Sequence, residues 1–368
     1  LTSQPGYAKS IAYNKNGYDY DDAEVQIGFR FGEVQLFFEK IRNTWGYGRS
    51  GSLVLSERAP GYPQVRFSVQ LLSNLKLTML VAYLYSGLVD STRTYTDYTD
   101  GTFKNPRVVY RDKYLFAHAL EYSPTTALNL TLGEEVLISD RFDPGYLLPI
   151  AFYHTVEVQA GAIDNINVWG GARYTFRGIG SLYTTLYLDN FDVTEGFYIV
   201  AGTLGGTAVN VGNSGIDLTA EYTLLRPFVY SNNITALNRT SNGYPIGYWL
   251  GEDGDVLQGW VDYRPIPRLC LTASYQKVRK GPIGTTAQHY AGGQFGFAKL
   301  DFLGGPTFRR SEFDFACKWE VWRGLFADLS YRLLTQSDPL PNREPDLSNR
   351  SLISFALQLN IFQLNDQY

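Results

Sequence analysis

The sequence predicts an all-β protein, a transmembrane antiparallel β-barrel of a bacterial outer membrane. Apolar and polar residues alternate along many short segments, as in strands with one face in lipid and the other facing a wet lumen. Aromatic residues make up 15% of the 368 residues, and barrels place such rings at both membrane interfaces. No run of about 18 apolar residues indicates a membrane helix. No linker divides the chain, so residues 1–368 are expected to form one barrel domain.

The individual strands follow from this alternation. The clearest is the last, where five apolar residues from Ile353 to Ile361 alternate with small or polar ones. Near the other end, Gly32 and Glu33 form a tight turn between two alternating segments, which indicates a hairpin. Ten of the expected strands occupy residues 8–17, 25–31, 34–38, 75–83, 128–133, 257–264, 269–276, 313–321, 327–333 and 351–362.

Short and long connections alternate between the strands, as short periplasmic turns and long extracellular loops do in outer-membrane barrels. The short ones are residues 32–33, 72–74, 123–126, 177–180, 211–215, 265–268 and 323–324, and the long ones are 45–63, 87–112, 139–165, 190–197, 230–255, 281–308 and 336–350. With residues 8–17 as a first strand that closes the barrel against the last, the count is about 16. Residues 149–160 or 243–251 could add a pair, so about 18 is the alternative.

The predicted inward faces carry charges and amides that a dry core would not accept unpaired, so the lumen must hold water or a polar plug. The two cysteines fall on opposite faces, Cys270 inward and Cys317 outward, which excludes a disulfide between them. The first residues show no signal peptide, so the chain is interpreted as a mature form, trimmed or not at its start.

Little in the sequence points to catalysis or to a cofactor. His118, His154 and His289 lie in separate segments, so neither a metal site nor a catalytic triad is indicated. No phosphate-binding, dinucleotide-binding or zinc-protease motif occurs. A net charge of −4 gives no support for a nucleic-acid partner. We therefore expect no catalytic residues, no metal and no cofactor.

Three long segments, residues 45–60, 139–154 and 242–253, combine aromatic, charged and amide side chains. Aromatic faces suit the C–H faces of sugars, and charged groups suit their hydroxyls. Loops folded into a barrel lumen use the same residues as a plug, and the two interpretations are compatible. The candidate carbohydrate-binding residues are Trp45, Tyr47, Arg49, Glu57, Arg58, Asp140, Arg141, Tyr153, Tyr244 and Trp249.

Residues 45–66, WGYGRSGSLVLSERAPGYPQVR, resemble the WGxGRxGxLxLSxxAPxxPxxR signature of Wzi-type capsule-assembly proteins. Shorter matches follow in the expected order at residues 120–122, 130–134, 147–153, 186–191, 221–223, 227–230 and 246–251, so the resemblance covers roughly residues 22–337. It implies a monomeric, non-catalytic outer-membrane barrel of about 18 strands, with a plugged lumen, that acts as a surface lectin. The family's periplasmic helical bundle has no counterpart in residues 1–22, which lack a helical period.

Two functions follow from these observations. The first is an outer-membrane lectin that anchors or organises capsular or other surface polysaccharide, in contact with outer-membrane lipid, with lipopolysaccharide and with other surface-assembly proteins. The second is a porin-type diffusion channel, because about 16 strands enclose an aqueous lumen unless it is plugged. Conductance in planar bilayers separates the two.

Overall fold

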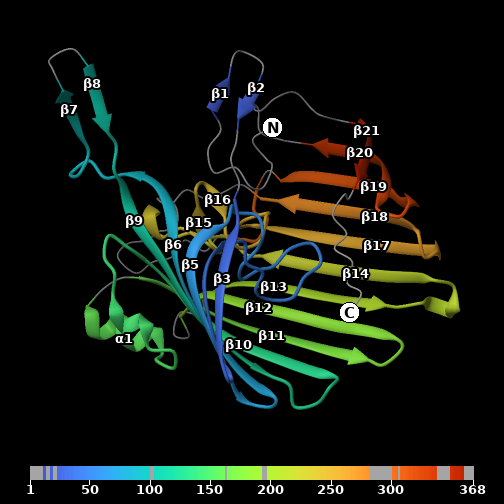
Figure 1. Cartoon of the computed structure of the whole chain (residues 1–368), viewed down its shortest axis with the longest axis horizontal. Helices are drawn as coiled ribbons and strands as arrows, with labels where there is room; N and C mark the ends of the chain where they lie inside the picture. Colours follow the sequence, from blue (N-terminus) through green and yellow to red (C-terminus); the bar gives the residue numbers. More distant parts are fainter. Residues whose placement is uncertain are drawn as a thin grey trace.

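The computed structural model describes residues 11–13, 17–19, 23–99, 103–161, 164–192, 197–281, 301–305, 307–337 and 349–359. Its main element is a strongly curved antiparallel sheet (Figure 1). Within the described residues this sheet has 15 strands, each paired with its neighbour along the chain except where β7, β8, β15 and β16 intervene. In sheet order they are β3 (Val25–Phe31), β4 (Val34–Ile41), β5 (Tyr62–Leu72), β6 (Leu75–Val89), β9 (Tyr110–Tyr122), β10 (Leu128–Ser139), β11 (Asn165–Phe176), β12 (Gly180–Asp192), β13 (Phe197–Ala208), β14 (Ile216–Leu225), β17 (Gly254–Ile266), β18 (Leu269–Lys280), β19 (Phe308–Trp322), β20 (Leu325–Ser337) and β21 (Arg350–Leu359).

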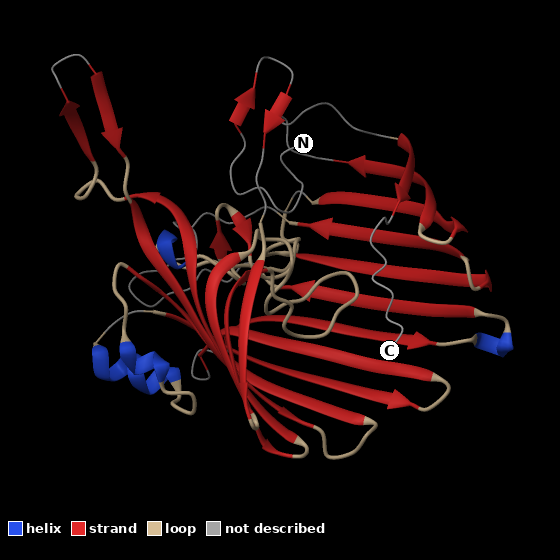
Figure 2. Cartoon of the chain, viewed as in Figure 1, coloured by secondary structure: helices blue, strands red, loops and turns tan. Residues whose placement is uncertain are grey.

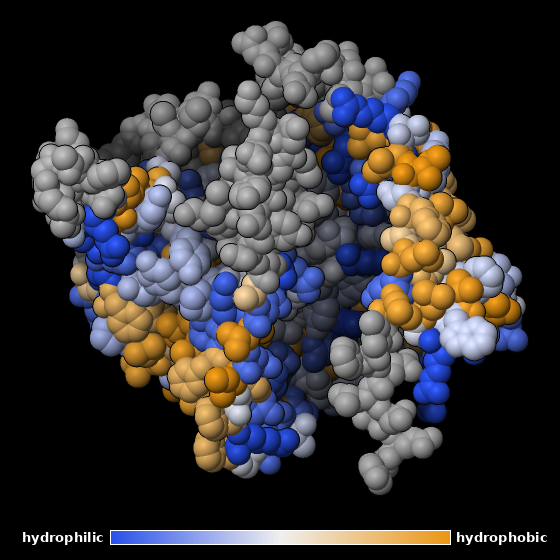
Figure 3. Space-filling view, turned by 45° about the horizontal axis from the view of Figure 1, so that its top comes forward, coloured by the Kyte–Doolittle hydropathy of each residue, from blue (hydrophilic) through white to orange (hydrophobic). Residues whose placement is uncertain are grey.

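The predicted alternation of faces is confirmed. Along β21, the apolar side chains from Ile353 to Leu359 are exposed, as are those of β3 and most of the odd-numbered large apolar residues of β17–β20; the others of that set are half-buried. The residues between them face the concave side, where Thr272 donates to Asp262 and Arg332 to Asp314 across neighbouring strands. Cys270 and Cys317 are both free thiols on opposite faces. Figure 3 shows apolar side chains on the flanks of the molecule and hydrophilic ones in the hollow between them.

The alternation of short and long connections is confirmed except between β12 and β13. The predicted long connection 190–197 is wrong, because these two strands stay paired as far as Asp192 and Phe197. Two to seven residues join β3 to β4, β5 to β6, β9 to β10, β11 to β12, β13 to β14, β17 to β18 and β19 to β20. The long connections lie at the opposite ends of the strands and hold the remaining elements: β7 (Tyr95–Thr99), β8 (Phe103–Arg107), η1 (Pro144–Leu147), α1 (Tyr153–Ala160), η3 (Thr235–Leu237), β15 (Thr240–Ser241) and β16 (Tyr244–Pro245). η2 (Val211–Asn213) lies in a short turn.

The expectation for the first strand is wrong over the part of it that the structure describes. β1 (Ile11–Tyr13) pairs with β2 (Gly17–Asp19) in a separate two-stranded sheet, and not with β21. Pairing with a neighbouring segment closes a short loop, which costs less chain entropy than pairing with the far end of the chain. The other residues of the expected strand 8–17 lie outside the described part, as do His289, most of the connection 281–308 and the last three residues, 360–362, of the expected final strand.

The two segments considered as an additional strand pair do not join the large sheet. Residues 153–160 form the helix α1, which ends at Gly161 in the left-handed conformation (φ +61°), where glycine carries no steric penalty. Residues 243–251 contain only β16, paired with β15 in a two-residue hairpin. Both segments belong to loops.

The hydrophobic core lies on the concave side of the sheet, where two long connections fold inward. Its buried residues come from residues 42–61 and 226–253 and from the inner faces of β5, β6, β9–β14, β17 and β18. Figure 2 shows these loops gathered in front of the strands. The predicted plug is therefore a folded structure with an apolar centre, and it positions the residues described next.

Candidate functional site

The connection between β4 and β5, residues 42–61, is called the plug loop below. Its centre, Leu53, Val54 and Leu55, is fully buried. Leu55 pairs through its backbone with Trp45, which closes the loop on itself. The Trp45 ring lies 6.1 Å from that of Trp169 on β11. The plug loop thus forms a small apolar core of its own, which packs against the concave side of the sheet.

A single carboxylate on the inner face of β14 holds the tip of the plug loop. Glu221 accepts hydrogen bonds from the backbone N–H groups of Arg49 (2.6 Å) and Ser50 (3.0 Å). The hydroxyls of Ser50 and Tyr183 donate to the same carboxylate. Four donors on one buried carboxylate fix the backbone of the tip, because hydrogen bonds to a charged group are stronger than neutral ones.

The Arg49 side chain is fixed by strands further along the sheet. Its guanidinium donates to Thr219 on β14 (3.1 Å) and forms an ion pair with Asp262 on β17 (2.7 Å). It also lies 4.7 Å from the centre of the Trp260 ring, a cation–π contact. Arg49 therefore ties the plug loop to β14 and β17.

Tyr47 makes the corresponding attachment on the other side of the loop. Its N–H donates to the Thr185 hydroxyl (2.7 Å), and its own hydroxyl donates to the side-chain oxygen of Asn129. Gly171 on β11 leaves the room for this ring, since a Cβ there would lie 3.1 Å from it. Tyr47 is thus an anchor of the loop in the sheet.

The second inward connection, residues 226–253, is called the luminal loop below, and it packs on the plug loop. The Tyr230 hydroxyl donates to the Leu53 carbonyl (2.6 Å), and Arg239 donates to the Val54 carbonyl. The Ser56 N–H donates to the carbonyl of Ile246 (2.8 Å). Backbone groups of each loop are therefore satisfied by the other, as buried polar groups require.

Arg239 also joins the luminal loop to the wall. It forms an ion pair with Glu135 on β10, and both side chains are fully buried. The Tyr187 hydroxyl donates to the same carboxylate (2.8 Å), and the guanidinium lies over the rings of Tyr187 and Tyr230. Burial lowers the pKa of Arg239 to about 9, so the group remains charged at neutral pH.

A pocket of about 450 Å³ opens where the two loops meet. Arg49, Glu57, Arg58 and Trp249, all of them candidates from the sequence, line it together with Thr44 and the glycines and serines of residues 48–56. Arg310 on β19 lies 5.3 Å from the Trp249 ring. Among the described residues, the Arg58 guanidinium makes no hydrogen bond or ion pair. The pocket therefore offers an aromatic face, hydroxyls, a carboxylate and an uncommitted cation within one hollow.

Three other candidates lie beside this pocket. Trp45 and Tyr47 anchor the plug loop to the strands of the sheet. Tyr244 belongs to β16 and packs against the hydrophobic core on the concave side. These residues shape the pocket and do not line it.

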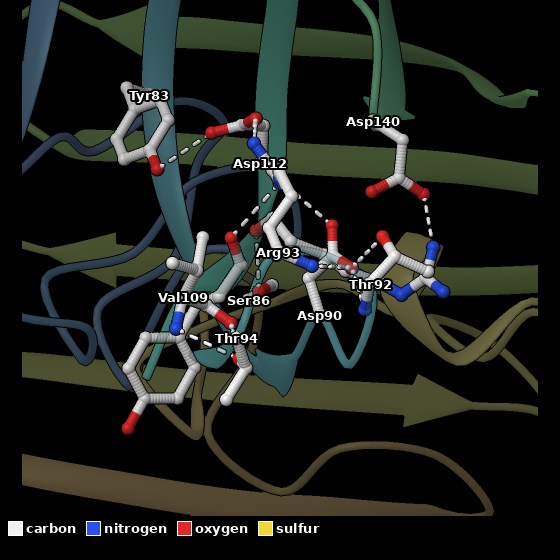
Figure 4. A network of polar contacts seen from close by, with 11 residues as sticks. Tyr83, Ser86, Asp90, Thr92, Arg93, Thr94, Val109, Asp112 and Asp140 are labelled. Carbon is white, nitrogen blue, oxygen red and sulfur yellow. Dashed lines mark hydrogen bonds and ion pairs between the residues drawn. The ribbon is translucent and has the colours of Figure 1, made fainter. Parts of the chain in front are cut away.

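The remaining candidates are in the connection between β10 and β11, away from the pocket. Asp140 pairs with Arg111 (2.6 Å) and Arg141 with Asp164 (2.6 Å), while Tyr153 is buried at the start of α1. Asp140 lies near the base of the β7–β8 hairpin (Figure 4).

The base of that hairpin is a polar network. Arg93 donates to Asp90 (2.6 Å) and pairs with Asp112 (2.9 Å), and the Thr92 hydroxyl donates to Asp90 (2.6 Å) (Figure 4). Hydrogen bonds from Thr92 and Arg93 hold the pKa of Asp90 below its ordinary value. The network braces the point where the hairpin leaves the sheet (Figure 1).

Besides Trp45, Tyr47 and Arg49, the residues that hold the loops in place were not among the candidates from the sequence. Glu221, Asp262, Glu135 and Arg239 stand far apart in the chain, and of these only Glu221 lies in a segment that matched the family, residues 221–223. A weak signal was available for Glu135, since the pattern puts this carboxylate on an inward face, where it needs a partner.

Gly48 provides a test of the tip geometry. A Cβ at this position would lie 2.0 Å from the Gly51 carbonyl oxygen, so Gly48→Ala must open the turn. We expect the variant to unfold at a temperature several degrees lower, which corresponds to a loss of about 1–3 kcal/mol for overpacking. Gly170→Ala is the control, because its Cβ would meet only one atom, at 3.7 Å. Equal unfolding temperatures for the two variants would contradict this account.

Among the described residues, no helix is long and apolar enough to cross a membrane. Nor does that part of the chain bring together three or more His, Cys, Asp or Glu side chains in a group that could hold a metal.

The curved sheet with an apolar outer face, alternating turns and an inward-folded plug defines an outer-membrane β-barrel. A solved structure of this class, Wzi of Escherichia coli, matches 94% of this chain and 72% of its own at 13% identity and a TM-score of 0.59. It is described as an outer-membrane protein involved in group 1 capsule assembly and a carbohydrate-binding β-barrel.

The chain belongs to the family described as capsule assembly protein Wzi, whose model matches residues 3–333. The resemblance found in the sequence is therefore confirmed. OccK10 of Pseudomonas aeruginosa (15% identity, 94% and 86% coverage, TM-score 0.47) and OccAB2 of Acinetobacter baumannii (13%, 94% and 79%, 0.47) match less well. No curated protein matches the chain.

Proposed function

We propose that this protein is a non-catalytic surface lectin of the outer membrane that holds capsular or other surface polysaccharide in the pocket between its two inward loops. The observation that carries the proposal is the convergence of Arg49, Glu57, Arg58 and Trp249 on one hollow. An indole face accepts the C–H face of a sugar ring, and guanidinium and carboxylate groups bind its hydroxyls. Family membership supports a role in capsule assembly.

In this proposal residues 1–368 act as one barrel domain, set in outer-membrane lipid and lipopolysaccharide. Other surface-assembly proteins are further expected partners. Deletion of the gene should release polysaccharide from the cell surface into the medium. Unchanged cell-associated polysaccharide in the deletion strain would argue decisively against the proposal.

The diffusion-channel alternative requires a continuous open lumen. The buried contacts between the plug loop, the luminal loop and the strands favour the lectin, because they fill the concave side of β6–β14 with packed side chains. Purified protein in planar bilayers should be nearly silent, whereas a steady open conductance would favour the channel.

Trp249→Ala should weaken polysaccharide binding without unfolding the protein. Loss of an aromatic stacking face is worth about 1–1.5 kcal/mol, or roughly fivefold to tenfold in Kd. The measurement is calorimetric titration of purified protein with capsular polysaccharide fragments. Trp322→Ala is the matched control, because Trp322 is exposed at the end of β19 and does not line the pocket. Equal affinities for the two variants would place the sugar elsewhere.

A further inference from the structure

Part of the connection between β10 and β11 packs on the outer face of the sheet. Tyr146 of η1 and Tyr153 of α1 form a buried cluster with Phe116, Val136 and Ile138. The ring of Tyr146 lies 5.6 Å from that of Phe116 on β9. This cluster is separate from the core on the concave side.

Polar contacts fix the same segment. The Tyr153 N–H, at the start of α1, donates to Glu134 on β10 (2.9 Å), and the Tyr153 ring lies 4.5 Å from that of His118. The Tyr146 hydroxyl donates to Asp164 (2.7 Å). The segment is therefore held firmly against β9 and β10.

The register of the strands gives the height of this segment on the wall. Leu132 pairs with Leu120, and the next pair on the same face is Glu134 with His118. Leu132 is 62% exposed and belongs to the alternating apolar residues that face lipid. Two residues along a strand span about 7 Å. The helix thus begins about 7 Å beyond the lipid-facing leucines, on the side of the long loops.

The surface that this segment presents outward is apolar. Between Asp143 and His154, residues 144–153 carry no charge. Within it, Ile150 is 84% exposed and Phe152 75%, and Leu147, Leu148 and, further on, Val158 are also exposed. Isolated exposed apolar residues are ordinary, but a contiguous patch of this kind marks an interaction site.

We propose that residues 147–158 are a membrane-interface anchor, with the side chains of Leu147, Leu148, Ile150, Phe152 and Val158 inserted into the outer leaflet beside the barrel. The patch is continuous with the lipid-facing surface of β9 and β10. The one formally charged residue of the run, Glu157, is only 17% exposed and accepts a hydrogen bond from the Asp164 N–H (2.9 Å), so the outward surface of the run carries no formal charge that opposes insertion. Such an anchor fixes the connection between β10 and β11 at the membrane surface. The proposal does not depend on polysaccharide binding.

The experiment places an environment-sensitive fluorophore at three positions. In a Cys270→Ser, Cys317→Ser background, single cysteines Leu132→Cys, Ile150→Cys and Tyr95→Cys are labelled with NBD. Leu132 is the lipid-facing reference. Tyr95, which is 59% exposed on the hairpin that projects from the sheet, is the aqueous reference (Figure 1). The labelled full-length proteins are reconstituted in phosphatidylcholine vesicles with and without doxyl-labelled phosphatidylcholine.

The label at Ile150 should emit at shorter wavelength than the label at Tyr95. Doxyl lipid should quench it at least half as strongly as it quenches the label at Leu132. Emission and quenching like those at Tyr95 would overturn the anchor. A blue-shifted label that doxyl lipid does not quench would also overturn it, since the patch would then be covered by protein. Heat-modifiable gel migration of each variant verifies that the barrel has folded.

Discussion

Arg239→Ala is expected to release the plug and to lower the stability of the protein by about 3–5 kcal/mol, the typical cost of removing one partner of a buried ion pair. Glu135 would keep its negative charge in a fully buried position with only the Tyr187 hydroxyl as donor. The Val54 carbonyl would lose its donor as well. Both changes weaken the contacts that join the luminal loop to the plug loop and to β10.

Two measurements test this loss of stability and the release of the plug. The temperature at which the barrel converts to its unfolded form on a gel should fall, and planar bilayers should show channel openings that the unaltered protein lacks. The double variant Arg239→Met, Glu135→Leu removes both charges and fills the space with apolar side chains, so it should recover most of the stability. If Arg239→Ala alone were as stable and as silent as the unaltered protein, the ion pair would not hold the plug.

The barrel wall could be predicted from the sequence because its physical rule is local. Strands in lipid must alternate with period two, so Ile353–Leu359 and the hairpin at Gly32 could be recognised from the residues alone. The ends of the sheet obey no such rule. Ile11–Tyr13 lies in a segment that was expected to be a wall strand, yet it pairs with Gly17–Asp19, because a local pattern does not specify a partner.

The candidate site, too, could be predicted from the sequence only in part. Aromatic and charged residues in long loops marked Arg49, Glu57, Arg58 and Trp249, and these four do meet in one pocket. The same composition also marked Tyr153, which is buried on the outer face. Loop composition does not reveal to which side of the wall a loop folds. That choice depends on distant partners such as Glu221, which only the folded chain brings to Ser50.

Glu221→Gln is expected to abolish most polysaccharide binding, although Glu221 is not one of the residues that line the pocket. The amide keeps the volume of the carboxylate but replaces one acceptor oxygen with a donor, which would then face the N–H of Arg49 or the N–H and hydroxyl of Ser50. Loss of two charge-assisted hydrogen bonds costs at least about 3 kcal/mol. The tip of the plug loop would then leave its place beside Trp249, with roughly a hundredfold loss of affinity.

Asp328→Asn is the control for this variant, because it removes a carboxylate from the concave face of β20, where no contact with the plug loop is formed by the described residues. Calorimetric titration with polysaccharide fragments measures both variants, and gel migration with and without heating verifies that each barrel has folded. If Glu221→Gln bound polysaccharide as tightly as Asp328→Asn, the pocket would not depend on the tip, and the four candidates that line it would not form the binding site. Because Arg49 retains its own bonds to Thr219 and Asp262, a selective loss of binding would show that the backbone of the tip, and not the Arg49 charge alone, shapes the site.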